Sequence, residues 1–520
     1  MVGVGLKPSH SLWLLLGLAL AIRLYFLLSH QGMWGVDGGA YLLSRNSVLG
    51  QESTGTDFPR PPLAPGWLLV PFTWVLGDDW GLKAFALVAS FVIVPSFLLL
   101  ARALLTPWQT VWALGLVLGD GMLAEMFTAG PLPMFGFAFI FLAMWALWRI
   151  KQRGLTWQTG IALSVSFPGI TYTNQTATGI ALLALSLFVL FLGIRQVVAK
   201  AWLPLGIGVL FGLTALPWYL AVFPGSEQLR YPGPTVGLYS FNNAGWFQFV
   251  WGVPVAIIAM WRRAPLLRAL GSGLLLTSLF SPLISYDETI QNILYRSRYL
   301  MMPLLYLCII WMVGQSRLRL LGRPILVTGM ALLVVVQGAS YVYQLQTETK
   351  LGRMVTPETQ EAIIWLRDNG GPGTVVTNSY SLSLYVAALS DHKTAWVQVF
   401  SPPPAYQRQH QQVLVLLGWR AGDAQEAAQE LGASYVLAET LWPAYGADIG
   451  SKVPGLGKAY ALVNRYAQLQ DENLGYIWQA PGSLEDDASR SNPWLVTEAK
   501  ARWLKLIWQK GTTRIWQIAF

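Results

Sequence analysis

Long runs of apolar residues alternate with short polar segments over the first two thirds of the chain. Ten runs are long enough to cross a bilayer as a helix, which takes about 17 to 25 residues. They lie at residues 12–28, 81–101, 131–148, 157–173, 177–194, 202–223, 245–261, 266–284, 299–314 and 324–343. A shorter apolar stretch at residues 107–119 is expected to form another crossing. The pattern predicts a mostly α multi-pass membrane protein with about 11 transmembrane helices.

The pattern changes after about residue 346, beyond which no apolar run of this length occurs. The spacing of apolar positions predicts helices at residues 357–369, 380–389, 405–417 and 424–431, strands at residues 374–377, 395–400 and 434–438, and a hairpin of residues 504–508 and 513–518. We therefore expect two domains, a transmembrane domain at residues 1–345 and a C-terminal soluble α/β domain at residues 346–520.

Composition supports a membrane protein, because 54% of the 520 residues are hydrophobic and only 12% are charged. Soluble proteins carry roughly 25% charged residues. The net charge of +9 arises entirely in residues 1–345, which hold 20 Lys and Arg but only 10 Asp and Glu. So few charges cannot form a basic groove for nucleic acid, and we expect no nucleic-acid partner.

Twelve basic residues lie at alternate helix ends that contain no acid. They are Arg102, Arg149, Lys151, Arg153, Arg195, Lys200, Arg262, Arg263, Arg268, Arg317, Arg319 and Arg323. The positive-inside rule makes these ends cytoplasmic. The ten acids, and with them the C-terminal domain, then face outward from the cell (plasma or inner) membrane. Arg23, within the first run, is expected to extend to the outer interface or to face a polar cavity.

The first outer loop, at residues 29–66, holds the first candidate for chemistry. Asp37 lies among glycines, which let the backbone approach a ligand closely. A carboxylate in that position can act as general base on an acceptor hydroxyl. The alternative is a turn aspartate that accepts hydrogen bonds from its own backbone.

Arg60 follows in the same loop and is flanked by Pro59, Pro61 and Pro62. The prolines stiffen the chain, so the guanidinium loses little entropy when it binds a phosphate. The alternative is an interfacial arginine that contacts lipid headgroups.

Two further pairs are candidates on the outer side. Asp120 and Glu125 are separated by five residues, which places them about 140° apart on an ideal helix, so a shared site requires a bent segment. They could bind a metal or simply lie in a solvated loop. Arg296 and Arg298 bring positive charge to the outer boundary, which indicates an anionic partner, either a ligand or the nearby acids at residues 287–288.

The order of these motifs resembles the GT-C superfamily of integral-membrane glycosyltransferases, particularly the branch of aminoarabinose transferases and protein O-mannosyltransferases. The resemblance rests on the crossings, on Asp37 followed by Tyr41, on Arg60-Pro61-Pro62-Leu63, on Arg298-Tyr299, and on a C-terminal region that opens with a helix containing Trp365-Leu366-Arg367 and closes with a hairpin. The pattern departs from many relatives in having Gly38 after Asp37 and arginine, not lysine, at position 60.

The resemblance implies a hexosyl or pentosyl transferase that uses a polyprenyl-phosphate sugar donor. The acceptor would be a lipid, a glycan or a protein at the outer face of the membrane. It makes Asp37 the catalytic base of an inverting transfer. It also makes Arg60, Arg298 and Arg296 ligands of the donor phosphate. Tyr41, Asp120 and Glu125 would be substrate-binding residues.

No cofactor is required by these motifs, but a divalent metal is a candidate, with Asp37, Asp120 and Glu125 as its candidate ligands. Two other functions are compatible with the pattern. The first is a multi-pass transporter or flippase of a lipid-linked saccharide, for which no clear internal repeat is found. The second is a binding protein whose helices serve as an anchor. Membrane lipids are expected partners in all three cases.

Overall fold

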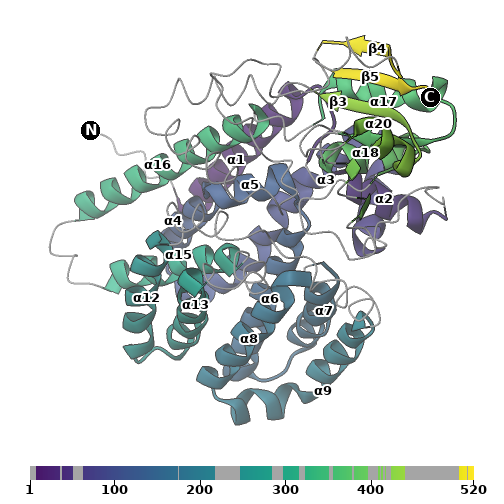
Figure 1. The fold of residues 1–520 in the computed structure, drawn as a ribbon. Coiled ribbons are helices and arrows are strands. Elements are labelled where there is room, and N and C mark those ends of the chain that lie inside the picture. The colour runs from purple at the N-terminus through teal and green to yellow at the C-terminus, as the bar shows by residue number, and fades with distance from the viewer. Residues whose placement is uncertain are drawn as a thin grey trace.

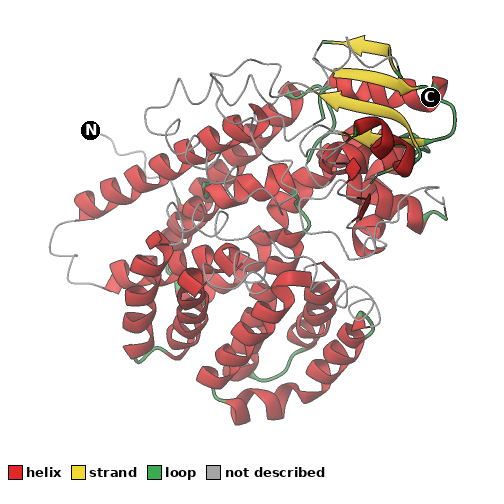
Figure 2. Ribbon diagram, in the orientation of Figure 1, coloured by secondary structure: helices red, strands yellow, loops and turns green. Residues whose placement is uncertain are grey.

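The computed structural model describes residues 7–35, 38–50, 63–173, 175–216, 246–283, 297–315, 323–350, 355–377, 380–395, 423–439, 503–511 and 513–520, together with residues 408–409, 412–413 and 416. Helices form the part of the chain before residue 350, and strands occur only after it among these residues (Figures 1 and 2).

The part before residue 350 is a bundle of helices of very different lengths. They are α1 (Pro8–Ser29), α2 (Gly38–Val48), α3 (Leu63–Leu104), α4 (Pro107–Leu118), α5 (Gly121–Ala129), α6 (Pro133–Arg153), α7 (Trp157–Thr173), α8 (Gln175–Leu192), α9 (Ile194–Leu213), α12 (Trp246–Trp261), α13 (Pro265–Leu283), α15 (Ser297–Gln315) and α16 (Arg323–Lys350). Each apolar run found in the sequence overlaps one of these helices. Three described helices are long and apolar enough to cross a membrane, and six shorter apolar helices accompany them. The number of crossings stays a prediction.

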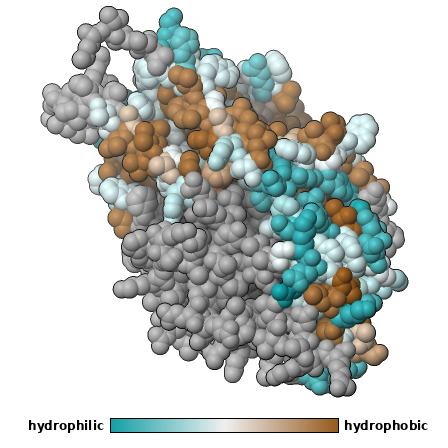
Figure 3. Space-filling view, turned by 90° about the horizontal axis from the view of Figure 1, so that it is seen from above, coloured by the Kyte–Doolittle hydropathy of each residue, from teal (hydrophilic) through white to brown (hydrophobic). Residues whose placement is uncertain are grey.

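The outer surface of the bundle is apolar, as expected for helices in lipid. Trp74 is 87% exposed and Trp261 is 85% exposed, whereas Phe97 and Phe141 are fully buried and pack edge to face with ring centroids 5.9 Å apart. Hydrophobic residues also predominate along the upper part of the described surface in Figure 3, whereas its right-hand side is mostly hydrophilic with hydrophobic patches. The exposed aromatic side chains would be costly in water and are favourable in a bilayer.

The segment between the first two predicted crossings contains more helix than the sequence pattern predicts. Helix α2 lies within the expected outer loop, and α3 begins at Leu63, before the apolar run at residues 81–101. The α3 helix is interrupted at Gly77, whose φ of 74° is accessible mainly to glycine. This break allows the chain to change direction directly before Asp78.

The C-terminal unit, defined here as residues 355–377, 380–395, 423–439, 503–511 and 513–520, is built around a five-stranded sheet. It contains α17 (Pro357–Asn369), β1 (Thr374–Thr377), α18 (Tyr380–Leu389), β2 (Lys393–Thr394), α20 (Ala424–Leu431), β3 (Ala433–Glu439), β4 (Leu504–Lys510) and β5 (Thr513–Ile518). The strand order is β2-β1-β3-β5-β4; β1 is parallel to both of its neighbours, and β5 is antiparallel to both of its own.

Most of the elements predicted for this region are present. The strand predicted at residues 395–400 is wrong at its first residue, because β2 ends at Thr394 and Ala395 lies outside a strand. Residues 396–400 lie outside the described residues. Most of the helix predicted at residues 405–417 lies outside them as well. The first helix begins where Thr356 accepts a hydrogen bond from the backbone N–H of Thr359, a typical N-cap.

The sheet separates two hydrophobic cores. On one face, Val375, Leu437 and Ile515 belong to the core that continues into the membrane helices. On the other face, Val436 and Trp516 pack in a smaller core with residues of α20. Side chains alternate between the faces of a strand, so each strand contributes to both cores. The C-terminal unit is therefore packed onto the helix bundle through a continuous apolar interior.

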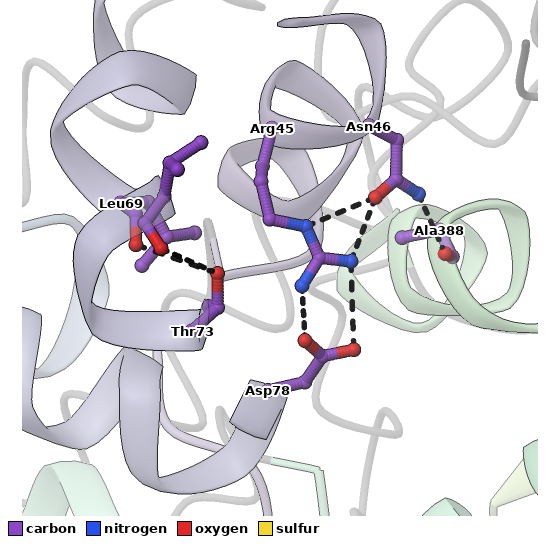
Figure 4. Close-up of polar contacts among 7 residues, drawn as sticks. Arg45, Asn46, Leu69, Thr73, Asp78 and Ala388 are labelled. Atoms are coloured by element: carbon purple, nitrogen blue, oxygen red, sulfur yellow. Dashed lines mark hydrogen bonds and ion pairs between the residues drawn. The ribbon is translucent and has the colours of Figure 1, made fainter. Parts of the chain in front are cut away.

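Helix α2 lies between the C-terminal unit and α3, and Arg45 connects the three (Figure 4). The Arg45 guanidinium donates to Asn46 Oδ1 at 2.7 and 3.0 Å and forms an ion pair with the Asp78 carboxylate. Asn46 in turn donates from Nδ2 to the carbonyl oxygen of Ala388 on α18, at 2.9 Å. The basic helix turns α6–α7, α8–α9 and α12–α13 lie at the opposite end of the bundle (Figure 1).

Gly66 allows α2 to approach the first turn of α3, and we predict that Gly66→Ala destabilises the protein. A Cβ at this position would lie 2.5 Å from the carbonyl carbon of Ser44 and 2.8 Å from the backbone nitrogen of Arg45. Overpacking of this kind costs about 1–3 kcal/mol. The measurement is the midpoint of thermal unfolding of the detergent-purified protein, which should fall.

Gly17→Ala is the matched control, because Gly17 is exposed on α1 and a Cβ there has no atom within 4 Å. Alanine is the better helix former by about 1 kcal/mol, so this variant should unfold at the same temperature or slightly higher. Equal midpoints for the two variants would contradict the close packing of α2 on α3.

Candidate functional site

The chain directly before Asp37 is anchored in the interior of the protein. Trp34 is 1% exposed, and its indole N–H donates to the carbonyl oxygen of Phe127 on α5 at 2.8 Å. The two rings also pack against each other with centroids 5.0 Å apart. On the other flank, the Gly38 N–H donates to the Gly35 carbonyl at 3.2 Å. The protein therefore fixes both flanks of the segment that carries Asp37.

Several of the residues selected from the sequence are described only in part or not at all. Asp37, Arg60 and Arg296 lie outside the described residues. Glu125 lies within α5 and Arg298 within the first turn of α15, but only their backbone is described. Their roles therefore stay predictions.

Tyr41, which the resemblance makes a substrate-binding residue, lies in α2 and is buried. It is 7% exposed, and its ring packs edge to face against Phe85 of α3 with centroids 5.8 Å apart. The ring thus helps to hold α2 against α3.

Asp120 is the candidate whose surroundings are described most fully. Its backbone carbonyl accepts hydrogen bonds from Leu123 and Ala124, so the residue precedes α5 and its side chain is only 4% exposed. The carboxylate accepts a hydrogen bond from the Tyr306 hydroxyl at 2.5 Å and one from Gln337 Nε2 at 3.5 Å. Gln337 also donates to the Tyr306 oxygen at 2.9 Å. One buried carboxylate thus links α5, α15 and α16.

Asp120 and Glu125 precede the apolar run at residues 131–148, and the structure has a further helix there. A separate helix, α5, begins directly after Asp120 and contains Glu125, and α6 starts only at Pro133. Asp120 therefore lies between α4 and α5 and precedes the helix to which Glu125 belongs, and a site shared by the two acids stays a prediction.

Helix α15 connects Asp120 to the predicted phosphate ligand. Arg298 precedes Tyr306 by eight residues, which corresponds to about 12 Å along a helix axis and little more than two turns. The backbone therefore places Arg298 towards the N-terminal end of α15, and Tyr306 holds Asp120 deeper in the bundle.

A second polar cluster, which the sequence pattern did not predict, lies at the C-terminal end of α1. Lys83 is 3% exposed; its ammonium group donates to the His30 carbonyl at 2.9 Å and to the Asp79 carboxylate at 3.2 Å. Burial lowers the pKa of the His30 imidazole, and the charge of Lys83 lowers that pKa further. The Asp79–Lys83 spacing of four residues on one helix was the signal that could have revealed the pair.

Arg23 does not extend to the membrane interface, so that expectation is wrong. The side chain is fully buried, and Nη1 donates to the Ala19 carbonyl at 3.2 Å. The guanidinium carbon lies 4.9 Å from the centroid of the Phe91 ring and 4.7 Å from that of Tyr341. Aromatic faces stabilise a cation more strongly where water is excluded. The packing against these rings explains how a charged group is held inside the bundle.

The described residues contain no cluster of side chains suited to a metal ion. Within these ranges, no three His, Cys, Asp or Glu side chains lie together as metal ligands would. Two of the three candidate ligands, Asp37 and Glu125, have side chains that are not described, so a site shared with Asp120 stays a prediction.

The chain is similar to known proteins in structure but not in sequence. No protein-family model matches the chain, and none of the curated proteins matches it in sequence.

Solved structures, in contrast, match most of the chain. ArnT from Cupriavidus metallidurans bound to undecaprenyl phosphate is 12% identical, with 97% of each chain covered and a TM-score of 0.58. The arabinofuranosyltransferase AftD from Mycobacteria is 13% identical over 97% of this chain and 40% of its own, with a TM-score of 0.55. The oligosaccharyltransferase of Archaeoglobus fulgidus, tethered with an acceptor peptide, is 12% identical over 83% of this chain and 69% of its own, with a TM-score of 0.54.

All three neighbours are GT-C glycosyltransferases, in agreement with the resemblance of the sequence motifs. The chain therefore has the fold of the GT-C membrane glycosyltransferases.

Proposed function

We propose that this protein is a membrane glycosyltransferase that moves a sugar from a polyprenyl-phosphate donor to an acceptor on the outer face of the membrane. The observation that carries the proposal is the shared fold over 97% of both chains with ArnT, which was solved with undecaprenyl phosphate. A lipid, a glycan or a protein supplies the acceptor nucleophile. The motifs in the first outer loop and at the start of α15 support the same donor chemistry.

The distribution of charge supports the outward orientation. The basic turns lie at one end of the bundle and the C-terminal unit at the other (Figure 1). Lys151 on α6 donates to the Leu192 carbonyl at the end of α8, so two of the basic ends are in direct contact. The positive-inside rule assigns that end to the cytoplasm. The C-terminal unit and Asp37 then lie on the extracytoplasmic side.

Asp37 acts as the general base in the proposed reaction. Its carboxylate removes the proton of an acceptor hydroxyl while the acceptor oxygen forms a bond to the anomeric carbon of the donor. The bond between that carbon and the phosphate oxygen breaks, and polyprenyl phosphate leaves. A single displacement inverts the anomeric configuration, and the proton remains on Asp37 until it passes to water.

Arg60, Arg298 and Arg296 bind the donor phosphate. The phosphate carries one negative charge in the donor and gains a second as it leaves, so cations fixed around it stabilise the transition state more than the ground state. The lipid tail lies among the apolar helices.

Asp120, Glu125 and Tyr41 complete the proposed site as substrate-binding residues. Tyr306 and Gln337 hold the Asp120 carboxylate in one orientation, and such fixed groups orient a sugar with little loss of entropy. A divalent metal held by Asp37, Asp120 and Glu125 would also bring positive charge near the phosphate.

Asp37→Asn should reduce transfer about 10²–10⁴-fold, the usual contribution of a general base. Transfer is measured with purified protein and a radiolabelled polyprenyl-phosphate sugar. Asp57→Asn is the matched control in the same loop and should keep the wild-type rate. A wild-type rate for Asp37→Asn in folded protein would remove Asp37 from the mechanism. Movement of an intact labelled lipid-linked saccharide across the membrane of proteoliposomes, without transfer of its sugar to an acceptor, would favour the transporter or flippase.

Arg60→Ala should raise the KM for the donor at least about tenfold, because a lost ion pair with phosphate is worth at least about 1.4 kcal/mol. The KM for the acceptor should stay unchanged. Arg102→Ala, at the basic end of α3, serves as the control and should alter neither constant. An unchanged donor KM in Arg60→Ala would show that Arg60 does not bind the phosphate.

Tyr306→Phe should lower the free energy of unfolding by about 1.5–3 kcal/mol, because it removes a hydrogen bond to the buried Asp120 carboxylate. Tyr341→Phe is the control, since the Tyr341 hydroxyl has no hydrogen-bond partner among the described residues. The midpoint of thermal unfolding and the transfer rate should both fall in the first variant and not in the second. Similar behaviour of the two variants would argue against a role for the Asp120 cluster.

A further inference from the structure

Tyr385 is a side chain of the C-terminal unit that contacts the segment directly before Asp37. It lies on α18 and is fully buried. Its hydroxyl lies 2.8 Å from the Gly35 carbonyl oxygen and 3.0 Å from that of Trp34, and it donates to this pair of carbonyls. Both acceptors belong to residues that directly precede Val36 and Asp37 in the chain.

The segment after Asp37 contacts the same helix. A Cβ on Gly38 would clash with the Tyr385 hydroxyl and lie 2.9 Å from Cζ of that ring. A Cβ on Gly39 would lie 2.6 Å from both the carbonyl carbon of Leu384 and the backbone nitrogen of Tyr385. The two glycines therefore permit a contact between α18 and the start of α2 that any larger residue would prevent.

The opposite anchor of this segment is Trp34. Its indole donates to Phe127 on α5, the helix that begins directly after Asp120. One short segment is thus tied on one side to the helix that follows Asp120 and on the other to the C-terminal unit. Gly35, Gly38 and Gly39 would allow the backbone many conformations without these two contacts.

We propose that Tyr385 is a positioning residue for Asp37, and that the C-terminal unit thereby completes the catalytic loop. This inference rests on the proposed function, because it takes Asp37 as the base. Tyr385 acts through the backbone carbonyls of Trp34 and Gly35 and does not touch the reacting atoms. General-base catalysis depends steeply on position, and a displacement of about 1 Å can cost on the order of 10²-fold in rate.

The first experiment compares Tyr385→Phe with Tyr435→Phe in the full-length protein. Tyr435 is a buried tyrosine of the C-terminal unit whose hydroxyl accepts a hydrogen bond from the Gly371 N–H at 2.8 Å, so each variant removes a buried hydroxyl that is hydrogen-bonded to the backbone. Tyr385→Phe should lower kcat at least about tenfold and leave the donor KM unchanged, because the proposed phosphate ligands lie in other segments. Tyr435→Phe should lower neither constant.

Hydrogen exchange supplies a measurement that does not depend on activity. Backbone amides of residues 31–42 should exchange faster in Tyr385→Phe than in wild type, and at the wild-type rate in Tyr435→Phe. Unchanged exchange in Tyr385→Phe overturns the inference. An equal fall of kcat in both variants overturns it as well, because the effect would then reflect general loss of stability.

A double-mutant cycle tests whether Tyr385 and the glycines act through one contact. Gly38→Ala should lower kcat in the wild-type background and lower it less in the Tyr385→Phe background, where the clashing hydroxyl is absent. Independent, multiplicative effects would contradict a shared contact. If wild-type protein transfers no sugar from any polyprenyl-phosphate donor, the proposed function fails. The exchange measurement then still decides whether Tyr385 orders residues 31–42.

Discussion

The packing of α18 on α2 connects the C-terminal unit to the membrane helices, and the arrangement of this end of the helix bundle depends on it. The contact excludes side chains at Gly38 and Gly39 and places the Ala388 carbonyl within 2.9 Å of Asn46. Arg45 extends the connection from Asn46 to Asp78, just after the break in α3. The hydrophobic core is continuous across the same boundary. The C-terminal unit is thus a structural part of this end of the bundle.

The elements that could be predicted from the sequence are those with a strong local pattern. Apolar runs located the long helices, and the alternation and caps of the C-terminal region located α17, α18 and α20 closely. Helix α2 was missed because it begins with two glycines, which favour no helix by themselves, and is held by packing against α3 and α18. The early start of α3 was missed because charged residues around Gly77 interrupt its apolar pattern.

In the candidate site, too, single residues could be predicted from local sequence, but their packing partners could not. Asp120 could be selected as a carboxylate on the outer side, but its partners Tyr306 and Gln337 lie 186 and 217 residues further along the chain. A local pattern does not indicate such contacts, because they follow from helix packing. Arg23 was misjudged for a related reason. Its position near a membrane boundary suggested an interfacial group, whereas rings from three other helices surround it.

The structure narrows the choice of groups that could bind an anionic donor. Of the 20 basic residues before residue 346, twelve lie at the basic helix ends and Lys7 lies at the start of α1. Aromatic rings surround the Arg23 guanidinium, and Asp78 pairs with Arg45. The Lys83 ammonium group donates to Asp79 and to the His30 carbonyl at the end of α1. The other four are Arg60, Arg230, Arg296 and Arg298, which the sequence pattern predicts on the outer side. A phosphate whose charge grows from one to two needs fixed cations that no carboxylate already neutralises. We therefore expect the ligands of a polyprenyl-phosphate donor among these four residues, three of which belong to the motifs that suggested this donor.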